Sequence, residues 1–184
     1  MSNQCLVVID MINGFIHEGA LSDPRIASII PLNVKLVESF LADHNPVIAF
    51  RDAHKLEDQE FEFYPVHCLE GSHESELIDE LKRFQDQMLV IPKNTTNGFF
   101  TPAFQNFLEQ NKDLKEVTIC GCCTDICVLQ FAQTLMTYAQ TQDRPLILKV
   151  VQASVDTYHS DLHDHDTYQR LGLSLMKASG IQIL

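Results

Sequence analysis

The sequence has few basic residues and no long hydrophobic run. Thirteen Lys and Arg residues stand against 25 Asp and Glu residues, which gives a formal net charge of -12 at pH 7. This charge repels phosphate backbones and anionic membrane surfaces and argues against nucleic acid as a partner. No apolar run approaches the roughly 20 residues that cross a bilayer, so we expect no membrane-spanning segment. The first ten residues lack a basic region followed by a cleavable apolar stretch, and we expect a cytoplasmic protein.

Linkers, internal repeats and low-complexity tracts are also absent. No Gly- or Ser-rich segment separates two domains, and 184 residues can bury most of the apolar surface of one domain. The sequence therefore predicts a single domain over residues 1–184. Because a reducing compartment and a sufficient core remove the means and the need for disulfides, we interpret all six cysteines as thiols. They are Cys5, Cys68, Cys120, Cys122, Cys123 and Cys127.

Apolar segments rich in Val, Ile and Leu alternate with segments of helical period, which predicts a β-α-β order. The predicted strands cover residues 4–10, 47–51, 88–92, 116–121, 146–151 and 181–184. The predicted helices cover residues 31–41, 74–84, 102–110, 125–140 and 162–178. Because the strands are continuously apolar, both faces of the sheet must be covered. The sequence thus predicts an α/β protein with helices on both sides of a six-stranded parallel sheet.

Cys127 is the candidate nucleophile. Residues 119–128 run from a buried strand through a tight turn into a predicted helix, and Cys127 falls in its first turn. Unpaired backbone N–H groups and the positive end of the helix dipole favour a thiolate there. The same N–H groups can hold an oxyanion.

The cysteines have two other interpretations. Buried cysteines are usually small hydrophobic residues, and we prefer that interpretation for Cys5, Cys68 and Cys120. Four thiols within eight residues could also hold a metal cluster, but they do not form two separated Cys-x-x-Cys pairs. The placement of Cys127 favours catalysis.

Ionisable residues follow three predicted strands. Asp10 ends the first, Asp52 and His54 follow the second, and Lys93 follows the third. In an open parallel sheet, ligands bind beyond the carboxyl ends of the strands, where Cys127 is also expected. One such residue is usually only a solvated strand end, but four that converge predict an active site with Asp10 and Lys93 as partners of Cys127.

Asp52 and His54 are two residues apart, so both side chains point to one side of an extended segment and can bind one cation. Downstream, His67 and Glu60 offer further ligands. Two imidazoles with carboxylates suit zinc, with manganese or iron(II) as alternatives. The other interpretation makes His54 a surface loop residue and His67 a hydrogen-bonded core residue.

Four further histidines, His73, His159, His163 and His165, compete for a metal role. Residues 159–165 follow the fifth predicted strand and open the last predicted helix, where Asp and Ser act as caps. We interpret this segment as a cap, and a role in the site is the alternative.

Residues 121–128, Gly-Cys-Cys-Thr-Asp-Ile-Cys-Val, together with Asp10 and Lys93, resemble the isochorismatase-like cysteine hydrolase family over essentially the whole chain. The resemblance implies a three-layer αβα, Rossmann-like fold with strand order 3-2-1-4-5-6. It implies a catalytic triad of Asp10, Lys93 and Cys127, a cis peptide between Cys122 and Cys123, and an oxyanion hole from the backbone N–H groups of Cys123 and Cys127.

The nicotinamidase branch is the most similar, because Asp52-Ala53-His54 and Tyr64-Pro65-Val66-His67 match its metal motif and Glu60 matches a ligand found in some members. The resemblance implies hydrolysis of nicotinamide through a cysteine thioester, with a divalent metal as cofactor. It places Phe15, Tyr64 and Cys122 against the substrate.

Two residues depart from the family pattern: Cys123 replaces Ala or Val, and Tyr64 replaces the commoner Trp. Three functional alternatives therefore stay open. The first is a nicotinamidase, the second a related cysteine amidase for another small amide or N-carbamoyl compound, and the third a non-catalytic binding protein that keeps the fold. By analogy with the family, we also expect a homo-oligomer.

Overall fold

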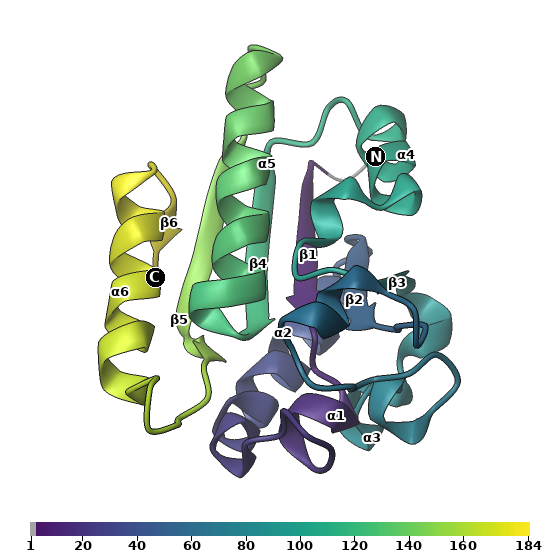
Figure 1. The fold of residues 1–184 in the computed structure, drawn as a ribbon. Coiled ribbons are helices and arrows are strands. Elements are labelled where there is room, and N and C mark those ends of the chain that lie inside the picture. The colour runs from purple at the N-terminus through teal and green to yellow at the C-terminus, as the bar shows by residue number, and fades with distance from the viewer. Residues whose placement is uncertain (1–2) are drawn as a thin grey trace.

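The computed structural model describes residues 3–184, so Met1 and Ser2 of the predicted domain lie outside the described residues. Six parallel strands form one sheet in the order β3-β2-β1-β4-β5-β6, which confirms the predicted topology (Figure 1). The strands are β1 (Gln4–Ile9), β2 (Val47–Asp52), β3 (Leu89–Lys93), β4 (Glu116–Cys122), β5 (Ile147–Asp156) and β6 (Gln182–Ile183).

Helices cover both faces of this sheet (Figure 1). They are α1 (Asn13–Ile16), α2 (Ile30–Ala42), α3 (Asp79–Lys82), α4 (Pro102–Gln110), α5 (Leu129–Thr141) and α6 (His165–Ala178). A π-helical turn, Thr124–Val128, precedes α5, and short 3-10 turns cover Pro24–Ile29, Gln59–Glu62, His73–Ser75, Gln85–Gln87 and Gly98–Phe100. Within the described part of the chain, no helix has the length and apolar character needed to span a membrane.

The core has two halves, one on each face of the sheet. Successive β1 side chains point to opposite faces, so Val7 packs with the core under α4, α5 and α6, while Val8 packs with the core under α2 and α3. Both residues are fully buried. This double burial is the physical reason for the continuous apolar strands in the sequence.

The helix predicted over residues 74–84 is too long. Only α3 is α-helical there, because the preceding backbone pairs with the loop after β1. The Asn13 N–H donates to Glu76 O at 3.0 Å, and the Ile78 N–H donates to Met11 O at 3.2 Å. Tertiary hydrogen bonds therefore replace the first turns that a local helix would have made.

Strands β1 and β4 are neighbours at the point where the strand order reverses, and Gly121 allows them to approach closely. Its φ is +111°, and a Cβ atom there would lie 2.0 Å from Ile9 O. We expect Gly121→Ala to lower the free energy of unfolding by at least about 3 kcal/mol, because positive φ strain adds to a backbone clash. Urea unfolding followed by circular dichroism measures the loss.

Gly71 provides the matched control for this prediction. Its φ is +79°, but a Cβ atom there would meet nothing within 4 Å. Gly71→Ala should lower the free energy of unfolding by about 1 to 2 kcal/mol, through the conformational strain alone. Equal losses for the two variants would show that the close approach of β1 and β4 does not constrain the fold.

Candidate active site

Four strands deliver ionisable side chains to one edge of the sheet. Asp10 follows β1, Asp52 ends β2, Lys93 ends β3, and Cys127 lies in the π-helical turn after β4. Lys93 Nζ lies 2.8 Å from Asp10 Oδ2 and also donates a short hydrogen bond to Asp52. The structure thus brings together the side chains that the sequence placed at the strand ends.

The ammonium of Lys93 holds two buried carboxylates. Burial raises the pKa of Asp10 to about 7, and the repulsion from Asp52 adds to this, while Lys93 and hydrogen bonding from Cys127 oppose it. Burial alone would lower the pKa of Lys93, but Asp10 and Asp52 raise it well above its ordinary value. Lys93 therefore stays charged, whereas Asp10 can gain or lose a proton near neutral pH.

The pKa of the Cys127 thiol is shifted in the direction opposite to the one expected from the sequence. Burial raises its pKa well above the ordinary value and the charges of Asp10 and Asp52 add to this, while Lys93 opposes. Burial thus opposes the thiolate that the start of the helix was expected to favour. The cysteine lies in a buried π-helical turn, 5% exposed, and α5 begins only at Leu129. A base must take its proton during a reaction.

A second group of ionisable side chains adjoins Lys93. One ligand atom from each of four residues lies within 4.8 Å of the others. His54 Nε2 and His67 Nε2 each lie 3.6 Å from Asp52 Oδ2 and 4.0 Å from Glu60 Oε1. This group, defined as the four-residue group of Asp52, His54, Glu60 and His67, contains all four predicted metal ligands.

The loop after β2 brings these residues together by folding back on itself. The His54 N–H donates to Cys68 O at 3.0 Å, and the Glu70 N–H donates to His54 O at 2.8 Å. His67 is thereby placed beside His54, and their ring centroids lie 4.6 Å apart. The 3-10 turn Gln59–Glu62 carries Glu60 into the same space.

The four-residue group fits a divalent cation. His67 Nδ1 donates to Pro65 O at 2.8 Å, which leaves Nε2 free to bind metal. His54 Nε2 is buried without a hydrogen-bond partner, and Asp58 Oδ2 lies 3.4 Å from His54 Nδ1. Metal–ligand bonds of about 2.1 Å in a tetrahedron place ligands about 3.4 Å apart, close to the observed separations. Sequence reasoning missed the supporting Asp58, four residues after His54.

The charges of the site also favour a cation. Burial and the neighbouring Asp52 raise the pKa of Glu60. Burial would also raise the pKa of Asp52, but the charge of Lys93 and the neighbouring imidazoles of His54 and His67 outweigh it and lower the pKa. Three carboxylates, from Asp10, Asp52 and Glu60, thus share the positive charge of Lys93. A bound divalent cation offsets the remaining negative charge.

We expect His54→Ala to weaken cation binding at least about 100-fold, because it removes a ligand and not merely its support. Zinc content after dialysis, together with competition against a chromogenic chelator, measures the change. His73→Ala is the control, since His73 is exposed and pairs with Glu18 outside the four-residue group. Equal zinc stoichiometry and affinity in His54→Ala and the wild type would refute the assignment.

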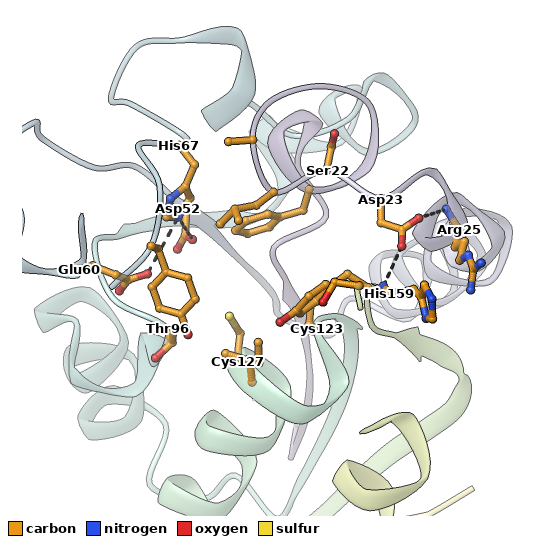
Figure 2. Close-up of a pocket in the computed structure, with 17 residues that line it drawn as sticks. Ser22, Asp23, Arg25, Asp52, Glu60, His67, Thr96, Cys123, Cys127 and His159 are labelled. Carbon is orange, nitrogen blue, oxygen red and sulfur yellow. Dashed lines mark hydrogen bonds and ion pairs between the residues drawn. The ribbon is translucent and has the colours of Figure 1, made fainter. Parts of the chain in front are cut away.

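A cavity of about 540 Å³ opens beside Cys127 (Figure 2). Its lining includes Asp52, Glu60 and His67 at one end and Cys127 on its wall. Asp10, which is fully buried, does not line it. The volume suits a small-molecule ligand.

Two of the three residues predicted to contact a substrate line this cavity. Phe15 and Tyr64 do so, and each ring also contacts the His67 ring. Cys122 does not, because its side chain is fully buried and its Sγ donates to Asp10 O at 3.2 Å. We therefore correct its role to support of the Asp10 backbone.

The backbone around the cysteine pair agrees with the family resemblance. The peptide bond between Cys122 and Cys123 is cis, and Cys123 lines the cavity next to Cys127. Sequence reasoning gave His159 a role in the site only as the alternative and missed Tyr158, for which position after a strand was the available signal. Tyr158 and His159 follow β5 at the same edge of the sheet.

Asp164 acts as the predicted cap of α6. Its side chain accepts a hydrogen bond from the Thr167 N–H at 3.0 Å. His163 pairs with Asp125, and His165 with Asp156. Neither histidine belongs to the four-residue group, as the capping interpretation expects.

The fold and the site together define an α/β enzyme whose chemistry lies at the switch point of a doubly wound sheet. The chain belongs to the isochorismatase family, because the family model for the isochorismatase domain matches residues 4–137. This match confirms the resemblance found in the sequence. The chain is therefore a member of a hydrolase family that includes amidases.

The similar proteins include nicotinamidases and other amidases. Nicotinamidase 1 of Arabidopsis thaliana is 28% identical in an alignment 212 positions long, gaps included, which covers 97% of this chain and 84% of that protein. The structure of N-carbamoylsarcosine amidase from Thermoplasma acidophilum has a TM-score of 0.79 at 26% identity, covering 99% and 95% of the two chains. Pyrazinamidase of Pyrococcus horikoshii in complex with zinc has a TM-score of 0.78 at 23% identity, covering 100% and 99%.

Proposed function

We propose that this protein hydrolyses nicotinamide to nicotinate and ammonia through a thioester on Cys127. The observation that carries the proposal is one cavity with Cys127 on its wall, the Asp10–Lys93 pair behind it and the four-residue group at its end. The similarity to Nicotinamidase 1 supports the choice of substrate. The partner in this proposal is a small-molecule amide.

In the first half-reaction, Asp10 accepts the proton of Cys127 as the sulfur attacks the carboxamide carbon. A base with a pKa raised to about 7 can accept and return protons near neutral pH. The new C–S bond moves the carbonyl electrons onto oxygen, and the backbone N–H groups of Cys123 and Cys127 hold this oxyanion. Lys93 stabilises the negative charges that develop beside it.

The first half-reaction ends when the tetrahedral intermediate collapses: the C–N bond breaks, and Asp10 gives its proton to the departing nitrogen, which leaves as ammonia. This leaves a thioester and an ionised Asp10. In the second half-reaction, Asp10 takes a proton from the water that attacks the thioester carbon. As the C–S bond breaks, Asp10 gives this proton to the Cys127 sulfur, and the carboxylic acid loses its own proton to solvent and leaves as nicotinate.

The walls of the cavity would orient the aromatic ring. Phe15 and Tyr64 line the cavity near the four-residue group, and aromatic side chains favour stacked or edge contacts with a planar ring. Asp52, His54, Glu60 and His67 would hold the cation, for which we propose zinc first and manganese or iron(II) as alternatives. When bound, the cation supplies a Lewis acid that can ligate the pyridine nitrogen and fix the ring.

Ammonia release from nicotinamide by the zinc-reconstituted protein tests this proposal. Saturable release is the expected result, and release at the rate of the Cys127→Ala variant would overturn it. A panel with pyrazinamide and N-carbamoylsarcosine separates the related amidases. The structural similarity to N-carbamoylsarcosine amidase at 26% identity makes an N-carbamoyl substrate the second candidate.

A further inference from the structure

Asp125, two residues before Cys127, is held by two hydrogen bonds from another part of the chain. Thr157 Oγ1 donates to Asp125 Oδ1 at 2.5 Å, and His163 Nε2 lies 2.8 Å from Asp125 Oδ2. The side chains of Asp125 and His163 are each 8% exposed. The segment that carries Cys127 is thereby attached to the chain after β5.

His163 is fixed on every side. Its Nδ1 lies 3.0 Å from Tyr158 O, and its ring stacks between Tyr158 and Tyr168, with centroids 3.9 Å and 3.8 Å away. The Tyr158 carbonyl and the Asp125 carboxylate are both hydrogen-bond acceptors, one at each ring nitrogen, and the two tyrosine rings cover the faces of the imidazole.

The same contacts reach the cavity. Tyr158 lines it, as Cys123 and Cys127 do. On the other side, α6 approaches Asp125 closely, since a Cβ atom on Gly172 would lie 3.0 Å from Asp125 Cα. Asp125 is therefore held between α6 and the wall of the cavity.

Neither helix capping nor apolar packing explains these contacts. Asp164 caps α6 by itself, so His163 is not needed for the helix start. The nearby core contains Val128, Phe131 and Val155, which pack without polar partners. The polar contacts of Asp125 and His163 instead connect two segments that both border the cavity.

We propose that Asp125 and His163 form a positioning clamp that holds the segment carrying Cys127 against Tyr158, so that the sulfur keeps its place beside Lys93 and Asp10. The clamp acts through Cys127 and does not touch the reacting atoms. The test of the clamp by kcat and KM rests on the proposed function, because it needs the substrate. The test by the chemical reactivity of Cys127 does not.

Four variants test the clamp. His163→Phe keeps the stacked ring and removes both hydrogen bonds, and Asp125→Ala removes the carboxylate. The double variant tests whether the two residues act as a unit. Asp125→Asn is the conservative variant, because its oxygen can accept from Thr157 and its NH₂ can donate to a neutral His163.

We expect His163→Phe and Asp125→Ala each to lower kcat about tenfold with KM changed by less than about threefold, because a displaced nucleophile weakens the transition state more than substrate binding. The double variant should lose no more than the worse single variant, as expected for coupled residues. Asp125→Asn should keep kcat within about threefold of the wild type. Unchanged kcat in His163→Phe, or fully additive losses, would overturn the clamp.

The alkylation rate of Cys127 by iodoacetamide, measured by peptide mass spectrometry, does not depend on the substrate. We expect it to fall at least fivefold in His163→Phe, because the sulfur moves away from the cation of Lys93 that favours its thiolate. His73→Phe is the control, since its partners Glu18 and Asn13 lie outside the Cys127 segment.

If the wild type leaves nicotinamide intact but His163→Phe still slows alkylation, the proposed function fails and the clamp stands. If the wild type is active and His163→Phe alkylates at the wild-type rate, the clamp fails and the function stands. Thermal unfolding provides the remaining comparison. A lower midpoint with unchanged alkylation would show a purely structural role and would overturn the clamp.

Discussion

Replacing Cys127 by alanine is expected to lower the rate of ammonia release by at least about 10⁴-fold, as the loss of a covalent nucleophile does in other hydrolases. The variant removes the only sulfur that we place in the reaction path. It should keep its fold, because Cys127 lines the cavity as well as one half of the core and the substitution removes only a sulfur atom. Zinc content should also be unchanged, since Cys127 is not in the four-residue group.

Cys120→Ala is the matched control for this prediction. Cys120 lies in β4, is fully buried and does not line the cavity. Its replacement should lower stability by about 1 kcal/mol through the small volume it leaves, with turnover retained. Ammonia release by Cys127→Ala at more than about one hundredth of the wild-type rate would contradict the nucleophile assignment.

Lys93→Met is expected to have the largest effect on stability. It leaves Asp10 and Asp52 buried side by side without their shared cation, and removal of one partner from a buried ion pair costs about 3 to 5 kcal/mol. Turnover should fall at least about 10³-fold, because the charges that develop beside Lys93 lose their stabilisation. Urea unfolding and ammonia release measure the two effects separately.

Lys149→Met provides the comparison for Lys93→Met. Lys149 Nζ lies 2.7 Å from Glu116 Oε2, but both side chains are 26% exposed. The loss of this partly solvated pair should cost less than about 1 kcal/mol and leave turnover unchanged. If both lysine variants lost the same stability, the Lys93 pair would not have the central role described here.

The fold was predictable because its signals are local. Continuous apolar segments indicated buried strands, and five of the six observed strands agree with the predicted ones within one residue at each end, whereas β5 runs five residues past its predicted end at Val151. The helix over residues 74–84 failed because a nonlocal hydrogen bond, from the Ile78 N–H to Met11 O, decides its backbone. The order of the strands depends on such distant contacts and came from the family resemblance, whereas the register of the strands was not predicted.

The site was predictable as a set of residues but not as a geometry. A charged residue after an apolar strand indicates the edge of the sheet, and this rule found Asp10, Asp52 and Lys93. It could not show that Lys93 lies between the two carboxylates, which depends on the register of three strands. Nor could it show that burial opposes ionisation of Cys127, since the depth of a side chain is a property of the folded molecule.

In the loop after β2, some residues of the site could be found from the sequence and others could not. His54 and His67 were named as ligands because both flank the expected cleft, while Asp58 was missed because a carboxylate in an acidic loop has no distinguishing pattern. Tyr158 was missed because an aromatic residue after a strand is usually a core residue. The single domain, the homo-oligomer and the cytoplasmic location stay predictions.

The most direct test of the thioester on Cys127 is mass spectrometry of protein quenched in acid during turnover of nicotinamide. We expect part of the wild-type protein to carry a nicotinoyl group on the peptide that contains Cys127, released by hydroxylamine as the hydroxamate. Cys127→Ala should carry none. A nicotinoyl group on a different residue, or turnover without any hydroxylamine-trapped product, would contradict the assignment of Cys127 as the nucleophile.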